Sequence, residues 1–161
     1  MQEFEGFSGT AHTNLDDKGR ISLSARHRQM LQAITPGVEN VQVTLSYKAP
    51  YGDVERCIHI YPLPEFAAIR MKLRAAPSTD PVVAAAKWQV LGNAVECTID
   101  KQGRLLIPAP LREQIGLSEA VTVQGGDNVL EVWSRSDWES TRKNVGSALA
   151  GGQKNLADRG I

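Results

Sequence analysis

Two short segments of this chain, residues 16–20 (DDKGR) and 100–104 (DKQGR), place an aspartate four positions before an arginine. Either of two roles fits this arrangement. In the first, aspartate and arginine form an exposed ion pair that only fixes a turn, which is the usual role of such pairs. In the second, Asp16 and Asp100 orient the guanidinium groups of Arg20 and Arg104, whose planar donors match the N7 and O6 acceptors of a guanine edge. The residue types alone leave both roles open.

A glycine precedes each arginine, and strand-forming residues lie on both sides of each segment, within residues 13–23 and 98–107. Gly19 and Gly103 allow the positive φ that a tight turn requires. We therefore predict the tip of a β-hairpin at each D-x-x-G-R segment.

The two turns belong to a longer repeat. Residues 15–31 return 84 positions later as residues 99–115, with five identities in 17 aligned positions. Unrelated segments of ordinary composition would share roughly one. Four further pairs are aliphatic in both copies, which indicates a shared core. The chain therefore contains two halves with the same fold.

Each predicted hairpin is followed by a short helix and two more strands. Ser24 is a candidate N-cap for the first helix, and Gly116 is a candidate end for the second. Apolar patterns predict the strands at residues 41–45, 57–61, 121–123 and 129–133. Residues 47–55 lengthen the connection between the last two strands of the first half.

Helices are also predicted between and after the two halves. Residues 64–76 form one helix, and Asp80 caps a second that extends to about residue 91. A third begins at Ser136, whose spacing to Glu139 is that of a capping box. The tail after residue 145 is rich in glycine and alanine and is predicted to be frayed or disordered.

This combination of motifs resembles the MraZ family, whose members are bacterial transcription factors built from two SpoVT/AbrB-type swapped-hairpin repeats. D-x-x-G-R followed by a short β run and a helix occurs twice, and IYPLPEF (60–66), PSTDP (77–81) and VWSRSDW (132–138) look like the family's helix entries. The likeness covers about residues 7–139. The first copy has Ser24 where the second has Pro108, and the tail after residue 144 has no family signature.

The resemblance implies a fold and a domain organisation. The expected fold is mainly β with flanking helices, in which two tandem AbrB-like swapped-hairpin repeats form a pseudo-symmetric β-barrel unit. The expected boundaries are 7–62 for the first repeat, 63–93 for a helical connector, 94–138 for the second repeat with a trailing helix to about 149, and 150–161 for a disordered tail.

The resemblance also implies sequence-specific binding of double-stranded DNA by a regulator of its own promoter and the adjacent cell-division and cell-wall genes. The family's motif arginine contacts DNA, which favours base contacts for Arg20 and Arg104. Lys18 and Lys101 flank the turns and suit phosphates, although plain solvation fits them nearly as well. Like-facing copies of the hairpin predict tandem guanine-containing direct repeats as the DNA site.

The net charge of the chain is zero, with 18 basic and 18 acidic side chains, so only local charge can attract a polyanion. Both repeats are modestly basic, and one protomer therefore offers few phosphate contacts. Several linked protomers would supply the missing affinity. We expect a homo-oligomer, for which the family precedent is a ring.

Two cysteines, Cys57 and Cys97, are too few for a disulfide framework and are expected to be strand residues in a reducing compartment. The sequence has no run of about 18 apolar residues, and its first residues lack the features of a signal peptide. We expect no membrane association and a cytoplasmic, nucleoid-associated protein.

Other functions have weaker support in the residues. A protein-interaction module, like the antitoxins that share AbrB folds, is the main alternative. Enzymatic use of Asp16 and Asp100 as an acid and base is not expected, because each aspartate is better explained by its own turn. A metal site is not expected either, although Cys57 and His59 would share a strand face and four candidate ligands exist: His12, Cys57, His59 and Cys97. No cofactor is predicted.

The remaining candidates have expected structural roles. Arg28 and Arg112 recur on the short helices, where we expect structural salt bridges or subunit contacts. Arg26 has no counterpart and stays a weak phosphate candidate. The three tryptophans are expected to be packing anchors: Trp88, Trp133 and Trp138.

Overall fold

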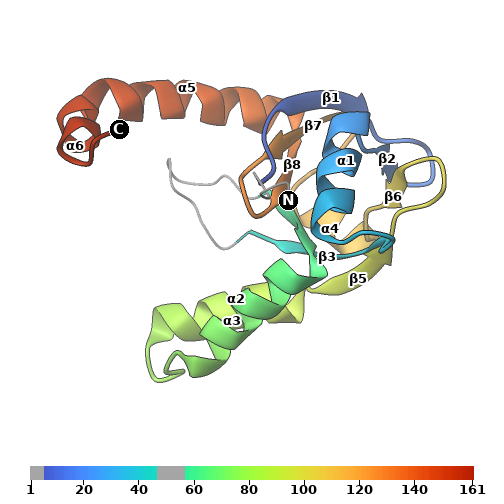
Figure 1. Ribbon diagram of the computed structural model, residues 1–161, viewed down its shortest axis with the longest axis horizontal. Coiled ribbons are helices and arrows are strands. Elements are labelled where there is room, and N and C mark those ends of the chain that lie inside the picture. Colours follow the sequence, from blue (N-terminus) through green and yellow to red (C-terminus); the bar gives the residue numbers. More distant parts are fainter. Residues whose placement is uncertain (1–5, 47–56) are drawn as a thin grey trace.

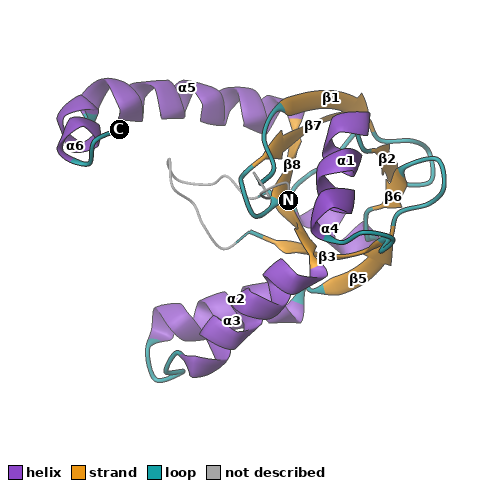
Figure 2. Cartoon of the chain, in the orientation of Figure 1, coloured by secondary structure: helices purple, strands orange, loops and turns teal. Residues whose placement is uncertain are grey.

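The body of the molecule is antiparallel β-sheet flanked by helices, which confirms the predicted fold class (Figure 1 and Figure 2). The computed structural model describes residues 6–46 and 57–161. The predicted insert in the first half, residues 47–55, lies outside the described residues. Within the described part of the chain, no helix is long and apolar enough to cross a membrane.

Each repeat has strands and a short helix in the same order. The first repeat contains β1 (Thr10–Asn14), β2 (Arg20–Ser22), α1 (Ala25–Ile34), β3 (Asn40–Leu45) and β4 (Ile58–Pro62). The second contains β5 (Val95–Thr98), β6 (Arg104–Leu106), α4 (Ala109–Gln114), β7 (Ala120–Gly125) and β8 (Leu130–Ser134). Two helices, α2 (Leu63–Ala75) and α3 (Pro81–Gly92), connect the repeats, and α5 (Arg135–Gly151) and α6 (Gln153–Asp158) follow the second.

The two repeats exchange their first strands. The six-stranded sheet has the order β1-β7-β8-β4-β3-β5, so β1 of the first repeat pairs with β7 of the second, and β5 pairs with β3. The order is unchanged when the repeats are interchanged and the sheet is read from its other edge. The sheet therefore has the pseudo-symmetric, swapped arrangement that the family resemblance implies.

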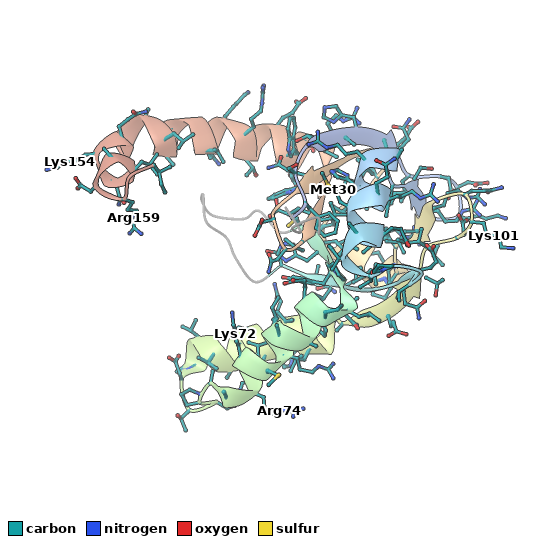
Figure 3. All side chains as sticks on the ribbon, viewed as in Figure 1. Met30, Lys72, Arg74, Lys101, Lys154 and Arg159 are labelled. Atoms are coloured by element: carbon teal, nitrogen blue, oxygen red, sulfur yellow. The ribbon has the colours of Figure 1, made fainter. Side chains whose placement is uncertain are left out.

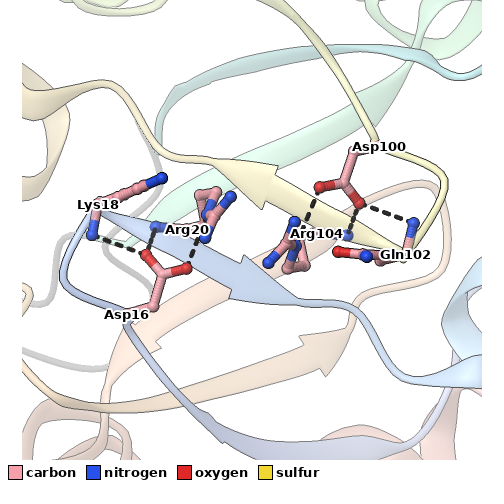
Figure 4. A network of polar contacts seen from close by, with 6 residues as sticks. All are labelled: Asp16, Lys18, Arg20, Asp100, Gln102 and Arg104. Atoms are coloured by element: carbon pink, nitrogen blue, oxygen red, sulfur yellow. Dashed lines mark hydrogen bonds and ion pairs between the residues drawn. The ribbon is translucent and has the colours of Figure 1, made fainter.

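A separate two-stranded ribbon links the two edges of this sheet. β2 pairs with β6 in antiparallel register, with Ile21 opposite Leu105. Each ribbon strand follows an edge strand, β1 or β5, through one D-x-x-G-R turn. Ile21 and Leu105 are fully buried, so the inner face of the ribbon packs on the core. The two turns consequently lie at opposite ends of the ribbon (Figure 4).

The main hydrophobic core joins both sheets and the two short helices. On β3, Val41, Val43 and Leu45 are fully buried, as the alternating pattern predicts. Leu31 of α1 and Leu111 of α4 join the same cluster. A second cluster, formed where α2 and α3 meet the sheet, contains Tyr61, Phe66, Leu73, Val90 and Val129.

Two of the described helices start after capping residues that the sequence identifies. Ser24 and Asp80 cap α1 and α3 as predicted, by accepting hydrogen bonds from backbone N–H groups at 3.2 and 2.8 Å. The helix after the second repeat starts earlier than predicted. Its N-cap is Ser134, not Ser136, and the Ser134 hydroxyl accepts from the Asp137 N–H at 3.4 Å.

Two predictions about the helical regions are wrong. Trp88 is not a packing anchor within the chain, because its side chain is 79% exposed on α3, whereas Trp133 is buried and Trp138 is half-buried. The α2–α3 hairpin extends away from the sheets, so packing against α2 covers only one face of α3 (Figure 1). The expected disordered tail contains α6, whose glutamine, lysine, leucine and alanine residues favour helix.

Candidate nucleic-acid interface

The first D-x-x-G-R turn is closed by its own aspartate (Figure 4). Asp16 Oδ1 accepts hydrogen bonds from the backbone N–H groups of Lys18 and Arg20, each at 2.9 Å, and Asp16 Oδ2 accepts one from Arg20 Nε at 2.7 Å. Gly19 has a φ of +82°, and its N–H donates to the Asp16 carbonyl at 3.1 Å. One carboxylate therefore holds both the turn backbone and the arginine side chain.

The second turn repeats this geometry. Asp100 Oδ1 accepts from the backbone N–H groups of Gln102 and Arg104, each at 2.9 Å, and Asp100 Oδ2 accepts from Arg104 Nε at 3.0 Å. Gly103 has a φ of +79°. The turn-fixing role and the arginine-orienting role, which the residue types left as alternatives, thus occur together in both turns.

The aspartates remain charged in this arrangement. The hydrogen bond from the backbone N–H of Arg20 holds the pKa of the Asp16 carboxyl below its usual range, and the Arg20 side chain acts in the same direction. The backbone N–H of Arg104 and then its side chain lower the pKa of Asp100 in the same way. At neutral pH both arginines therefore keep an ionised partner.

The terminal nitrogens of both arginines point away from these contacts. Within the described residues, Nη1 and Nη2 of Arg20 and Arg104 make no hydrogen bond, and the two side chains are 24% and 32% exposed. Because Ile21 and Leu105 face the core, the alternation of the strands puts both arginines on the outer face of the ribbon. The ribbon thus presents two pairs of donors to solvent on one face.

Leu106 lies on that outer face, opposite Arg20 in the register, and is 53% exposed. Its exposure was not predicted from the sequence. The sequence did contain a signal. Leu106 lies between Leu105 and Ile107, and this run of three apolar residues breaks the alternation expected of β6. An exposed apolar side chain beside two arginines suits contact with an apolar group on the same ligand.

Arg28 and Arg112 support the turns of the opposite repeat. A Cβ atom added to Gly19 would lie 2.5 Å from Arg112 Cζ, and one added to Gly103 would lie 2.8 Å from Arg28 Cδ. Arg112 Nε also donates to the Ile107 carbonyl at 2.9 Å. The expected salt bridges of these arginines do not occur among the described residues. Instead, each guanidinium packs on a turn glycine across the ribbon.

The two predicted lysines lie at the turn tips but are not equivalent. Lys18 and Lys101 are both exposed, and Lys101 is at the outer end of the β5–β6 turn (Figure 3). The residue that corresponds to Lys18 in the second turn is Gln102. Arg26, the weaker phosphate candidate, donates to Ser8 Oγ at 2.9 Å. The charge around the two turns therefore differs although their backbones match.

Of the four candidate metal ligands in the sequence, the structure separates His12 and Cys97 from the other two. His12 lies on β1, where its Nδ1 is hydrogen-bonded to Thr122 Oγ1 at 2.9 Å, and Cys97 lies on β5. Cys57 and His59 do come together, and Glu131, which the sequence analysis did not consider, joins them. No alternating pattern in the sequence could identify Glu131, because its position follows from the β4–β8 register.

Comparison with known proteins agrees with the repeat motifs. The profile of the family described as "MraZ protein, putative antitoxin-like" matches residues 90–159. The chain is similar to the "Transcriptional regulator MraZ" of Halorhodospira halophila, with 39% identity over 136 residues, 84% of each chain. It is 35% identical over 136 residues to that of Thioalkalivibrio sulfidiphilus, covering 84% of this chain and 85% of the relative. It is 33% identical to that of Serratia proteamaculans over 153 residues, 95% of each chain.

Proposed function

The chain belongs to the MraZ family, and on that premise we propose that it is a sequence-specific DNA-binding transcriptional regulator. In this proposal the β2–β6 ribbon enters the major groove, which is about 12 Å wide and admits a two-stranded ribbon. The role is binding without catalysis, and it is exercised in the cytoplasm, at the nucleoid.

The observation that carries the proposal is the orientation of the two guanidinium groups. Nε of Arg20 and Nε of Arg104 donate to Asp16 and Asp100. The two terminal nitrogens of each arginine therefore remain as a pair of parallel donors. Guanine N7 and O6 accept such a pair in the bidentate contact that is commonest in specific DNA recognition.

Neighbouring residues complete this proposed surface. Lys18 and Lys101 are exposed at the turn tips, where an ammonium group can contact phosphate without reading sequence. Leu106 suits the C5 methyl group of a thymine beside the guanine. The ribbon would therefore select guanine through the arginines and adjust the preference at one neighbouring position through Leu106.

We also propose that the chain acts as a homo-oligomer. The net charge is zero, so two arginines and two lysines per protomer give a small electrostatic contribution to affinity. The α2–α3 hairpin exposes Met71, Val82 and Trp88, which are 70%, 77% and 79% exposed. Several large apolar side chains exposed on one helical hairpin suit a protein interface. Head-to-tail contacts through it would close a ring.

A ring fixes the form of the operator. Like-facing hairpins from neighbouring protomers meet the duplex in the same orientation, so the proposed site is a set of tandem guanine-containing direct repeats. Repeats near one helical turn apart, about 10 base pairs, would lie on one face of the DNA. The proposed targets are the promoter of the protein's own gene and the adjacent cell-division and cell-wall genes.

The test is a footprint of the full chain on DNA upstream of its own gene, combined with methylation of guanine N7. We expect protection of direct repeats, loss of binding when guanines are methylated, and a sharp loss of affinity when half a helical turn is inserted between repeats. Absence of specific protection would overturn the proposal. An inverted repeat would refute the ring arrangement alone.

A protein-interaction module is the second candidate. It is favoured by the exposed apolar side chains of the α2–α3 hairpin and by the words "putative antitoxin-like" in the family description. If this candidate is correct, substitutions at Arg20 and Arg104 leave partner binding unchanged, and the footprint shows no specific protection.

A further inference from the structure

Three potential metal ligands, two of them buried, lie at the pseudo-twofold axis, outside the β2–β6 ribbon. β4 and β8 pair in a register that puts His59 opposite Glu131, and these are equivalent positions of the two repeats. Cys57 lies immediately before β4 (Ile58–Pro62), two residues from His59. One ligand atom from each residue lies within 4.8 Å of the other two.

Hydrogen bonds orient two of these ligands. His59 Nδ1 is 2.9 Å from Tyr61 Oη, so with Nδ1 protonated the lone pair of Nε2 points toward Glu131. Trp133 Nε1 donates to Glu131 Oε1 at 3.2 Å, and Glu131 Oε2 lies 3.8 Å from His59 Nε2. A hydrogen bond would require a shorter separation. Two bonds of about 2.1 Å at a tetrahedral ion would place nitrogen and oxygen about 3.4 Å apart, so a small movement suffices.

Two of the three side chains are almost inaccessible to solvent. Cys57 and His59 are 2% and 4% exposed, and the Glu131 side chain is 27% exposed. An ion that binds Cys57 takes the thiolate as a ligand, and the thiol proton is released to solvent.

We propose that Cys57 Sγ, His59 Nε2 and the Glu131 carboxylate bind a divalent ion of the zinc class. Sulfur and imidazole donors select zinc, or cobalt as its substitute, over magnesium and calcium, which require oxygen ligands. The fourth position faces a cavity of about 360 Å³, whose wall includes Gln124, Trp138 and Arg142. The ion would connect β4 of the first repeat to β8 of the second.

The proposal is tested by adding Co²⁺, and then Zn²⁺, to the reduced full chain. We expect one equivalent of Co²⁺ to bind with a thiolate-to-cobalt charge-transfer band and with visible bands of tetrahedral intensity. Zn²⁺ should displace it, and Zn²⁺ should also raise the melting temperature, because only the folded chain forms the site. Mg²⁺ should neither displace Co²⁺ nor raise the melting temperature.

Variants assign the ligands. Cys57→Ser should abolish the charge-transfer band, whereas the matched variant Cys97→Ser, at the other cysteine, should keep it. Glu131→Gln and His59→Asn should raise the Kd for Co²⁺ by more than about 100-fold, because loss of an outer-shell partner alone weakens binding about 10- to 100-fold. Tyr61→Phe, which removes only such a partner, should stay within that smaller range and keep the band.

Circular dichroism establishes that each variant is folded. If Cys57→Ser does not fold, the Glu131→Gln and Cys97→Ser variants decide the question. No charge-transfer band in the wild type, a band that disappears in Cys97→Ser, or equal Kd values for the wild type and Glu131→Gln would each overturn the proposal.

Discussion

Arg20 and Arg104 differ from ordinary exposed arginines because Nε is already hydrogen-bonded to an aspartate of the same turn. The bond limits the rotation of the guanidinium before any ligand arrives, so less conformational entropy is lost on binding. The same aspartates accept two backbone N–H groups each. The position of the arginine is therefore tied to the shape of the turn.

Replacing either arginine by lysine should weaken specific DNA binding while the fold persists. An ammonium group cannot make the bidentate contact, and we expect Arg20→Lys and Arg104→Lys each to lose about 1 to 3 kcal/mol of specific binding free energy. Fluorescence anisotropy on operator and scrambled DNA measures this loss. Arg159→Lys is a matched control, because Arg159 Nε also donates to a side chain four residues earlier, Asn155 Oδ1, at 2.8 Å. A parallel fall in melting temperature would instead indicate a purely structural arginine.

The aspartates should contribute stability that depends on pH. Their pKa values are lowered in the folded state, so their contribution is present above the unfolded value of about 3.9 and is lost as the pH falls through the folded pKa. We expect the double variant Asp16→Asn/Asp100→Asn to be less stable than wild type at pH 7 and to approach it below about pH 4. Urea unfolding at several pH values measures the difference. Asp158→Asn on the exposed helix α6 is the control, and a gap that widens on acidification would contradict this assignment.

At the residue scale, the sequence predicts contacts that are local in the chain. The Asp-to-Arg bond spans four residues, and a glycine before the arginine indicates a positive φ. Leu106, Arg112 and Glu131 could not be placed in the same way. Leu106 and Glu131 meet their neighbours through strand pairing between repeats, and Arg112 of α4 packs on Gly19 of the other repeat. Neither the strand register nor this packing can be read from a single segment.

Each turn packs against the short helix of the other repeat. The guanidinium of Arg112 occupies the space where a side chain at Gly19 would begin, and Arg28 does the same at Gly103. The carbonyls of these glycines also accept the Ile107 and Leu23 N–H groups, at 3.0 and 2.9 Å. Helix, ribbon and turn of opposite repeats are thus held together at the tip that we propose contacts DNA.

Gly19→Ala should destabilise the fold more than a positive φ alone explains. Gly37 provides the matched control, because its φ of +75° is similar and nothing lies within 4 Å of an added Cβ. We expect Gly37→Ala to cost about 1 to 2 kcal/mol of unfolding free energy, and Gly19→Ala to cost more because Arg112 must move. Urea denaturation measures both. In the double variant Gly19→Ala/Arg112→Ala the excess should disappear, and equal costs for the two single variants would refute the packing role.

The helices show where patterns in the sequence stop being informative. Caps at Ser24 and Asp80 are local and were identifiable, whereas the burial of α3 was not. Most residues of α3 are apolar, so no face is marked as inner, and Trp88 could have packed on the sheet or faced outward. The outcome depends on how the α2–α3 hairpin leaves the body of the molecule (Figure 1).

At the scale of the molecule, the exchange of β1 and β5 makes the repeats interdependent. Each repeat contributes an edge strand to the other and one strand to the ribbon. We expect chemical unfolding to be one cooperative step, with tryptophan fluorescence and far-ultraviolet circular dichroism changing together. Ile21→Ala and Leu105→Ala, one in each repeat, should each lower the free energy of unfolding by about 2 to 5 kcal/mol. Each should also shift the single midpoint to a lower denaturant concentration. Two separate transitions would show that the repeats fold independently.

The exposed face of the α2–α3 hairpin should control assembly, and through it the affinity for DNA. Trp88→Glu puts a charge on a side chain that is 79% exposed, so the protomer fold should persist while apolar contacts between protomers are lost. Light scattering should show the mass falling from a multiple of 17.5 kDa toward that value. Affinity for the operator should fall by about 10²- to 10⁴-fold, because separate protomers no longer bind neighbouring repeats at a high effective concentration. Affinity for a single half-site should stay unchanged. Leu149→Glu on α5 tests the same change at another exposed apolar residue, 50% exposed, and should leave mass and affinity intact. Two outcomes would contradict this prediction: a Trp88→Glu protein that keeps its mass, or a monomer that binds the whole operator as tightly as the wild type. Either one would show that tight DNA binding does not depend on assembly through this face.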